Sequence, residues 1–231
     1  MRLDKYICKS TELSTAQARD YIQSGEAGIN GEVCVYEARQ VHEGDVVTLH
    51  GNTLTLRAFR YLMLHKPAGY ISSNKDERHP SLLNLLDIDN RNVLNIAGRL
   101  DVDTTGLVLI SDDGRWTYNV SHPGLACSKL YRVGLSRPIE HEAIVTFKQG
   151  VMLKGANTPT RPATLTILKD KDVRLSITEG RNHQVKRMFR AIGNRVDTLH
   201  REQIGSVRLD IPEGQWRHLT EEEVLSFQYP K

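Results

Sequence analysis

A short polar loop in the middle of the chain holds the carboxylates most able to do chemistry. Asp101 and Asp103 stand two residues apart, between Gly98 and an apolar run over residues 107–110. The two carboxylates could hydrogen-bond their own backbone as turn residues, ligate Mg²⁺, or supply a nucleophile or acid–base group. No further carboxylate cluster stands out in the sequence to complete an oxygen shell, so a metal site is not expected. A loop joined to a buried strand can hold a catalytic carboxylate rigidly.

The densest basic stretch lies between residues 181 and 201. Its only acidic residue is Asp197, and its six basic residues are Arg181, Lys186, Arg187, Arg190, Arg195 and Arg201. This density suits contacts with nucleic-acid phosphates, and a solvated helix face is the alternative. The chain carries a net charge of +3, whereas residues 1–50 hold five basic and eight acidic residues. The positive charge is therefore concentrated after residue 50.

Four blocks of sequence follow one another along the second part of the chain. They are Leu64-His65-Lys66-Pro67-Ala68-Gly69, Gly98-Arg99-Leu100-Asp101 with Thr104-Thr105-Gly106-Leu107, Lys129-Leu130-Tyr131-Arg132-Val133, and Glu179-Gly180-Arg181-Asn182-His183-Gln184-Val185-Lys186-Arg187-Met188. In order and spacing these blocks resemble the ribosomal RNA pseudouridine synthases, over about residues 61–231. The chain is most similar to the branch that modifies the 16S RNA of the small subunit. The resemblance implies uridine 516 of that RNA as the target. The same reaction on 23S RNA, and a ribosome-assembly factor that binds ribosomal RNA without catalysis, are the alternatives.

The resemblance also implies the roles of individual residues. Asp101 would attack the ribose C1′ or remove a sugar proton, with the cation of Lys186 beside it. Tyr131 would pack against the detached uracil, and its hydroxyl is a candidate base for the C5 proton. Contacts with RNA are implied for Arg99, Arg181, Arg187 and Arg190. The reaction moves the glycosidic bond from N1 to C5 without a redox change, so neither a cofactor nor a metal is expected.

Residues 1–58, including a linker that begins at 51, are expected to form a separate module. Ser14 with Gln17 reads as a helix capping box, and Asn30-Gly31 marks a hairpin. Residues 1–7 and the Asn30-Gly31 turn resemble an S4 RNA-binding domain. That resemblance implies RNA contacts for Arg2 and Lys5.

The remaining chain, residues 59–231, predicts an α+β catalytic domain. Strands are expected over 61–65, 107–111, 131–135, 163–168 and 173–177. They do not alternate strictly with helices, which favours a mixed, mainly antiparallel sheet with flanking helices. The clearest helix covers about 183–192, where Val185, Met188, Phe189 and Ile192 form one apolar stripe. A last helix is expected to begin at Thr220, with Glu223 completing a capping box.

The three cysteines form no short-spaced pair, which fits a reducing cytosol. No apolar stretch in the sequence is long enough to span a membrane. We therefore expect a cytoplasmic monomer whose partner is ribosomal RNA and which has no membrane contact.

Overall fold

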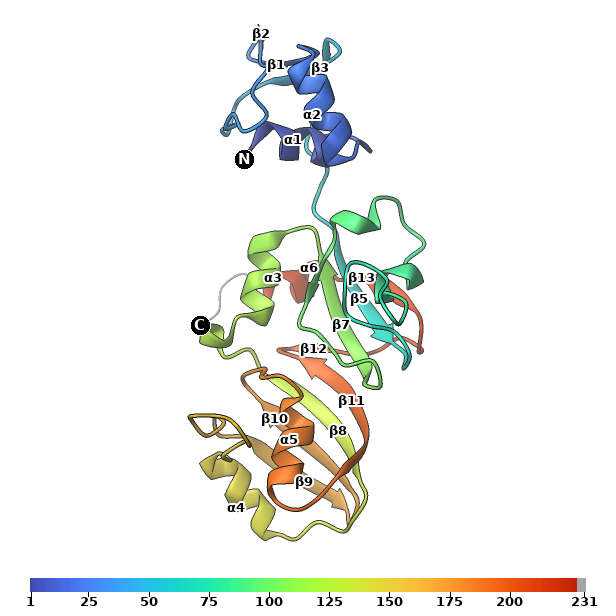
Figure 1. The fold of residues 1–231 in the computed structure, drawn as a ribbon, viewed down its shortest axis with the longest axis vertical. Coiled ribbons are helices and arrows are strands. Elements are labelled where there is room, and N and C mark those ends of the chain that lie inside the picture. Colours follow the sequence, from blue (N-terminus) through green and yellow to red (C-terminus); the bar gives the residue numbers. More distant parts are fainter. Residues whose placement is uncertain (228–231) are drawn as a thin grey trace. The chain divides into compact units, whose positions relative to one another are not determined.

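The computed structural model describes residues 1–227 and divides the chain into two compact units, Met1–Phe59 and Arg60–Lys231. Figure 1 shows the helices and strands of each unit. Within the described residues, no helix is both long and apolar enough to cross a membrane.

The first unit packs two helices on a small antiparallel sheet. The predicted capping box is confirmed, because the Ser14 side chain accepts from Gln17 N and Gln17 caps in return. The predicted hairpin is also confirmed, with Asn30 and Gly31 both at positive φ. The helix at 3–10 was not predicted, since it has only 8 residues and the side chain of its N-cap residue Arg2 does not cap it. The elements are α1 (Leu3–Ser10), α2 (Thr15–Gln23), β1 (Ala27–Ile29), β2 (Glu32–Val33), β3 (Val47–Leu49) and β4 (Asn52–Thr53), in sheet order β2-β1-β3-β4.

The second unit is built on one nine-stranded sheet, counted over the described residues. Along its main path the order is β13-β5-β7-β11-β8-β10-β9, and β7 and β11 pair in parallel while the other neighbours are antiparallel. The predicted mixed, mainly antiparallel sheet is therefore confirmed. The strands are β5 (Tyr61–Lys66), β6 (Asn95–Ala97), β7 (Thr105–Ser111), β8 (Lys129–Leu135), β9 (Thr164–Lys169), β10 (Asp172–Ile177), β11 (Val196–Ile204), β12 (Val207–Arg208) and β13 (Trp216–His218).

Helices cover this sheet on both faces. They are α3 (Gly114–Ser121), α4 (Glu142–Gln149), α5 (Gln184–Ala191) and α6 (Glu221–Leu225), with 3₁₀-helices at Leu82–Leu85, Arg91–Val93 and Pro123–Leu125. The capping box at the start of α6 is confirmed, since Thr220 and Glu223 cap each other's backbone. One core cluster includes Trp116 of α3, Val224 of α6 and Leu107 of β7. Strand β7 also contributes Val108 to a second cluster, so it is buried on both faces.

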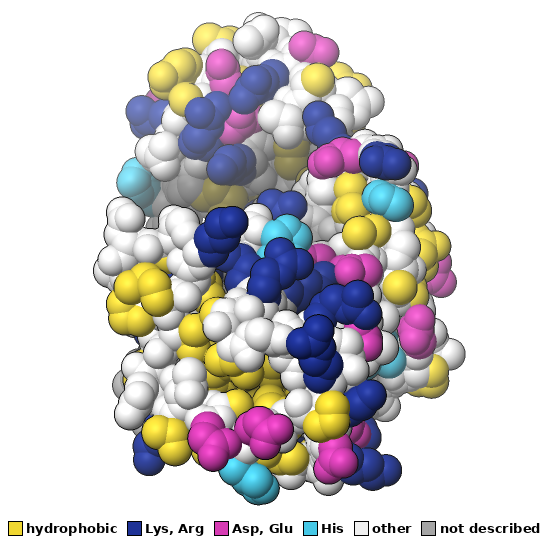
Figure 2. Space-filling model, turned by 60° about the horizontal axis from the view of Figure 1, so that its bottom comes forward, with side chains coloured by type: hydrophobic (Ala, Val, Ile, Leu, Met, Phe, Trp, Pro, Cys, Tyr) yellow, Lys and Arg dark blue, Asp and Glu magenta, His cyan; other side chains and the backbone are white. Residues whose placement is uncertain are grey.

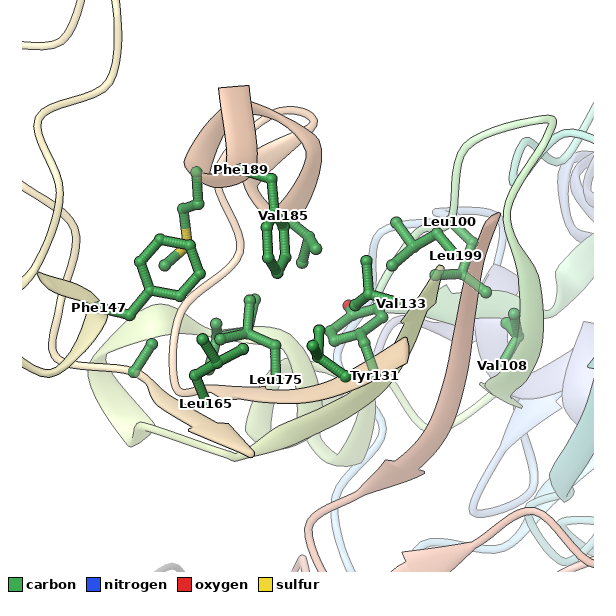
Figure 3. Packing of buried hydrophobic residues seen from close by; sticks show 14 of the residues in the cluster. Leu100, Val108, Tyr131, Val133, Phe147, Leu165, Leu175, Val185, Phe189 and Leu199 are labelled. Atoms are coloured by element: carbon green, nitrogen blue, oxygen red, sulfur yellow. The ribbon is translucent and has the colours of Figure 1, made fainter. Parts of the chain in front are cut away.

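The second cluster holds α5 against the other end of the sheet. Figure 3 shows Val185 and Phe189 of α5 pointing towards the strands that carry Tyr131 and Leu175. The ring of Phe147 meets that of Phe189 edge-on, with centroids 5.1 Å apart. The predicted apolar stripe of this helix is therefore confirmed, and packing it inward leaves the basic side chains on the other faces of α5.

Candidate active site

The loop that carries Asp101 joins β6 to β7, and hydrogen bonds to its backbone hold it in place. Its chain turns at Gly98, which has φ +87°, and the N–H of Thr104 donates to the carbonyl of Asp101. The buried hydroxyl of Ser72 accepts from Leu100 N at 3.0 Å and donates to Leu100 O at 2.9 Å. These bonds fix the backbone on both sides of Asp101.

A buried cation lies beneath the same loop. The side chain of Lys66 is 0% exposed, and its Nζ donates to Thr104 O at 2.7 Å, Pro67 O at 3.0 Å and Val102 O at 3.4 Å. Burial lowers the pKa of Lys66 to about 8, although the charges of Asp103 and Asp101 oppose the shift. Lys66 thus anchors the chain that follows Asp101.

The carboxylate of Asp101 is held through one of its two oxygens. Its Oδ2 lies 2.8 Å from Nδ1 of His183 and 3.1 Å from Nζ of Lys186. Within the described residues Oδ1 accepts no hydrogen bond, and the side chain is 29% exposed at the edge of a cleft. Asp101 therefore keeps one free oxygen for a reacting group.

Lys186 joins both carboxylates of the loop. Its Nζ also donates to Oδ1 of Asp103 at 2.6 Å. Burial disfavours the charged form of Lys186, but the hydrogen bonds with Asp103 and Asp101 prevail and raise its pKa. The same bond lowers the pKa of Asp103. Both partners are therefore charged at neutral pH.

The start of α5 brings His183 and Lys186 to the same carboxylate. His183 precedes the helix and has φ +46°, in the left-handed region. A non-glycine residue there costs about 1–3 kcal/mol, and such strain gathers at functional sites. Because the residues are three apart, both side chains reach the same side of the helix.

The cleft beside Asp101 has a volume of about 640 Å³, within the range of about 300–1,000 Å³ usual for small-molecule sites. Asp101 and Arg99 of the loop line it together with Tyr131 of β8 and His183. The side chain of Tyr131 is 7% exposed. The structure thus brings together Asp101, Lys186 and Tyr131, whose roles stay predictions.

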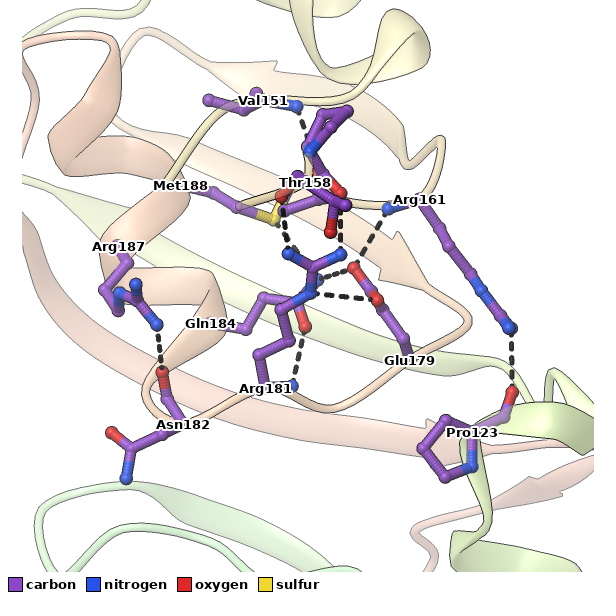
Figure 4. A network of polar contacts seen from close by, with 12 residues as sticks. Pro123, Val151, Thr158, Arg161, Glu179, Arg181, Asn182, Gln184, Arg187 and Met188 are labelled. Atoms are coloured by element: carbon purple, nitrogen blue, oxygen red, sulfur yellow. Dashed lines mark hydrogen bonds and ion pairs between the residues drawn. The ribbon is translucent and has the colours of Figure 1, made fainter. Parts of the chain in front are cut away.

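The basic residues expected to bind RNA occupy different surroundings. Arg99 and Arg190 are exposed. The guanidinium of Arg181 donates to the carbonyls of Thr158 and Pro159 and to Glu179, as Figure 4 shows. Arg187 donates to Lys154 O and Asn182 O. In the first unit, Lys5 is exposed and Arg2 pairs with the buried Asp4. Their contacts with RNA stay predictions.

Arg201, one of the six basic residues considered for phosphate contacts, is buried, so that part of the expectation is wrong. It is 1% exposed, since it alternates with His200 and Glu202 along β11 and points to the cleft face with Leu199. The spacing Leu199-x-Arg201 could have indicated this.

His183 was missed as a site residue, although its distance of three residues from Lys186 is the signal that could have found it. Within residues 1–227, no group of three His, Cys, Asp or Glu side chains is arranged to hold a metal ion.

Comparisons with known proteins agree with one another. The family described as RNA pseudouridylate synthase matches residues 60–191. The Ribosomal small subunit pseudouridine synthase A of Pasteurella multocida (strain Pm70) is 44% identical over 230 residues, which cover 98% of this chain and 99% of that protein. The protein of the same name from Vibrio cholerae serotype O1 is 44% identical over 228 residues, with the same coverage. A solved structure described as "Crystal structure of pseudouridylate synthase" superposes with a TM-score of 0.72 at 42% identity, over 98% of this chain and 99% of that one.

Proposed function

Since this chain belongs to the RNA pseudouridylate synthase family, we propose that it isomerises one uridine of small-subunit ribosomal RNA to pseudouridine. The names of its 44%-identical relatives support this substrate. Uridine 516 of 16S RNA is the proposed target. The observation that carries the proposal is the carboxylate of Asp101, held by Lys186 and His183 at a cleft that Tyr131 also lines.

The free oxygen of Asp101 is the proposed reacting atom. It either attacks the ribose C1′ or removes a sugar proton, and either step detaches uracil from C1′. The cation of Lys186 stabilises the negative charge of the carboxylate, and the bond from His183 fixes its direction. With Oδ2 occupied by two donors, the reaction proceeds at Oδ1.

The target nucleotide has to leave its stack to enter the cleft, which costs a few kcal/mol. Figure 2 displays a group of Lys and Arg side chains gathered near the middle of one face, an arrangement suited to binding phosphates. Arg99 and Arg190 are the exposed candidates. Arg181 and Arg187 already donate to backbone carbonyls of residues 154–159, so in our proposal they also shape the wall beside the RNA. The S4-like role of residues 1–58, with Arg2 and Lys5 on RNA, belongs to the same proposal.

Tritium release tests the function directly. Small-subunit RNA labelled with tritium at uracil C5 should lose label to water in the presence of the protein, because pseudouridine formation replaces the C5 hydrogen with the ribose. Release from 23S RNA alone would identify the large-subunit alternative. RNA binding without release from either RNA would favour the assembly factor.

A further inference from the structure

Arg201 is a buried cation in the wall of the cleft. Its Nε donates to Leu107 O at 2.7 Å, its Nη2 to Gly98 O at 2.8 Å and its Nη1 to the Tyr131 hydroxyl oxygen at 3.3 Å. Within the described residues it forms no ion pair with a carboxylate. A buried guanidinium without a carboxylate is expensive, so its position requires a compensating use.

The neighbourhood of Arg201 is positively charged. Lys129 is 6% exposed, lines the same cleft and donates through Nζ to Cys127 O at 2.8 Å. Burial lowers the pKa of Lys129, and the charge of Arg201 lowers it further. Preorganised cations of this kind stabilise negative charge that develops during a reaction. The cleft wall therefore suits an anionic oxygen or a detached uracil anion.

The strand that carries Arg201 lies very close to the strand that follows the Asp101 loop. A Cβ at Gly106 would collide with the backbone of Arg201, where β7 and β11 pair in parallel. The glycine lets the two strands approach, and this approach puts the guanidinium between Gly98 and Tyr131. Arg201 is thus connected both to the loop of Asp101 and to the tyrosine.

We propose that Arg201 is a positioning residue that holds the Tyr131 oxygen for removal of the C5 proton, an inference that rests on the proposed function. The N1–C1′ bond breaks and leaves its electron pair on N1. C5 then bonds to C1′ as the Asp101–C1′ bond breaks or as Asp101 returns the sugar proton, and C5 still carries its hydrogen. The Tyr131 oxygen accepts that proton as its own hydroxyl proton passes to water, and the C–H electron pair restores the ring double bond. N1 takes up a proton from water. The Nη1 bond orients the oxygen, and the guanidinium stabilises the negative charge that develops on it during the transfer.

A tritiated substrate and a fluorinated substrate together separate this role from a merely structural one. Tritium release from C5-tritiated uridine requires the proton transfer. When the target is 5-fluorouridine, fluorine stands in place of that hydrogen, so bond breaking and C5–C1′ bond formation proceed without the proton transfer. Water then adds across the remaining N1=C6 bond and gives a rearranged, hydrated fluorinated nucleoside. Single-turnover rates of both products are measured for each variant, with thermal unfolding as a check of the fold.

Arg201→Met should slow tritium release about 100-fold, the lower end of what a positioned acid–base group contributes, and slow the fluorinated rearrangement only a few-fold. Tyr131→Phe should change the ratio of the two rates in the same direction, and the double variant should be no slower in tritium release than Tyr131→Phe. Arg201→Lys should recover part of the loss. Ser72→Ala is the matched control, because it loosens the loop at Leu100 without touching the tyrosine. It should slow both products equally.

An equal fall of both rates in Arg201→Met would overturn the proposal, and so would wild-type tritium release by Tyr131→Phe. If Arg201→Met does not fold, the proposal is tested with Arg201→Lys, by the ratio of the rate of tritium release to the rate of the fluorinated rearrangement. Failure of the proposed function looks different, since the unmodified protein would then form neither product from ribosomal RNA.

Discussion

The two oxygens of Asp101 have different surroundings, and this difference organises the site. Oδ2 meets both His183 and Lys186, whereas Oδ1 accepts no hydrogen bond within the described residues, and Asp101 lines the cleft. The sequence motif pointed to Asp101 and Lys186 but not to His183. Glycine is the residue that signals a left-handed position most clearly, and His183 at φ +46° lacks that signal.

Asp103 and Lys186 should respond differently to substitution. Asp103→Asn removes one charge-assisted bond to Lys186, so we expect turnover to fall about ten-fold.

Lys186→Ala should reduce turnover much more than RNA affinity, because it leaves both carboxylates without their shared cation. Binding and single-turnover assays of both variants check this. If Lys186→Ala only weakens RNA binding and leaves the chemical rate unchanged, Lys186 has no role in the reaction at Asp101.

Lys66 should make stability depend on pH. Its pKa falls from 10.5 in the unfolded chain to about 8 in the fold, so between these values the unfolded state binds more protons. The free energy of unfolding therefore rises with pH from about 8 to 10.5. The full difference is on the order of 3 kcal/mol. Urea unfolding at pH 7, 9 and 10.5 should show a larger rise for the unmodified protein than for Lys66→Met. Equal rises in the two proteins would contradict the depressed pKa.

At the scale of elements, α5 shows what the sequence could predict and what it could not. The apolar stripe predicted the helix within one or two residues, and five predicted strands lie at their expected places. Strand β11 was not predicted, although it lies near the centre of the sheet. Its residues are mostly polar, since one face borders the cleft and the other carries His200 and Glu202 in a second hollow. Strand signals rest on alternating apolar residues, which β11 lacks.

The outward face of α5 should contribute to binding of the RNA backbone. Arg190 is exposed, and in the described residues its side chain forms no hydrogen bond or ion pair. For single-stranded RNA, Arg190→Ala should make the slope of log K against log salt shallower by at most about 0.7, the value for one neutralised phosphate. Equilibrium binding across a salt series measures this slope. Arg201→Met is expected to leave the slope unchanged because Arg201 is buried. An unchanged slope in Arg190→Ala would show that Arg190 does not contact an RNA phosphate.

At the scale of the whole molecule, the chain consists of two units with separate cores. Leu3, Ile7 and Ile22 belong to a cluster of the first unit alone, and the loop of Asp101 with all its partners lies in the second. The four sequence blocks that resemble the family also lie in the second unit. How the two units act together on RNA is not encoded in any local pattern.

Deletion of residues 1–58 should weaken RNA binding but leave tritium release detectable. The reason is that every contact described around Asp101 comes from residues after 60. Binding and single-turnover release of the shortened protein should be compared with those of the full chain at saturating RNA. Unchanged affinity would argue against an RNA-binding role of the first unit, and insoluble protein would indicate that the units depend on each other for folding.

We propose that Asp101 carries the isomerisation of a uridine of small-subunit RNA. The most direct test maps pseudouridine in 16S RNA from cells that lack the gene and carry either the unmodified protein or Asp101→Asn, at matched protein levels. We expect pseudouridine at one position, uridine 516 in our proposal, with the unmodified protein and none there with Asp101→Asn. Pseudouridine restored by Asp101→Asn, or no position of that RNA that depends on the gene, would contradict it.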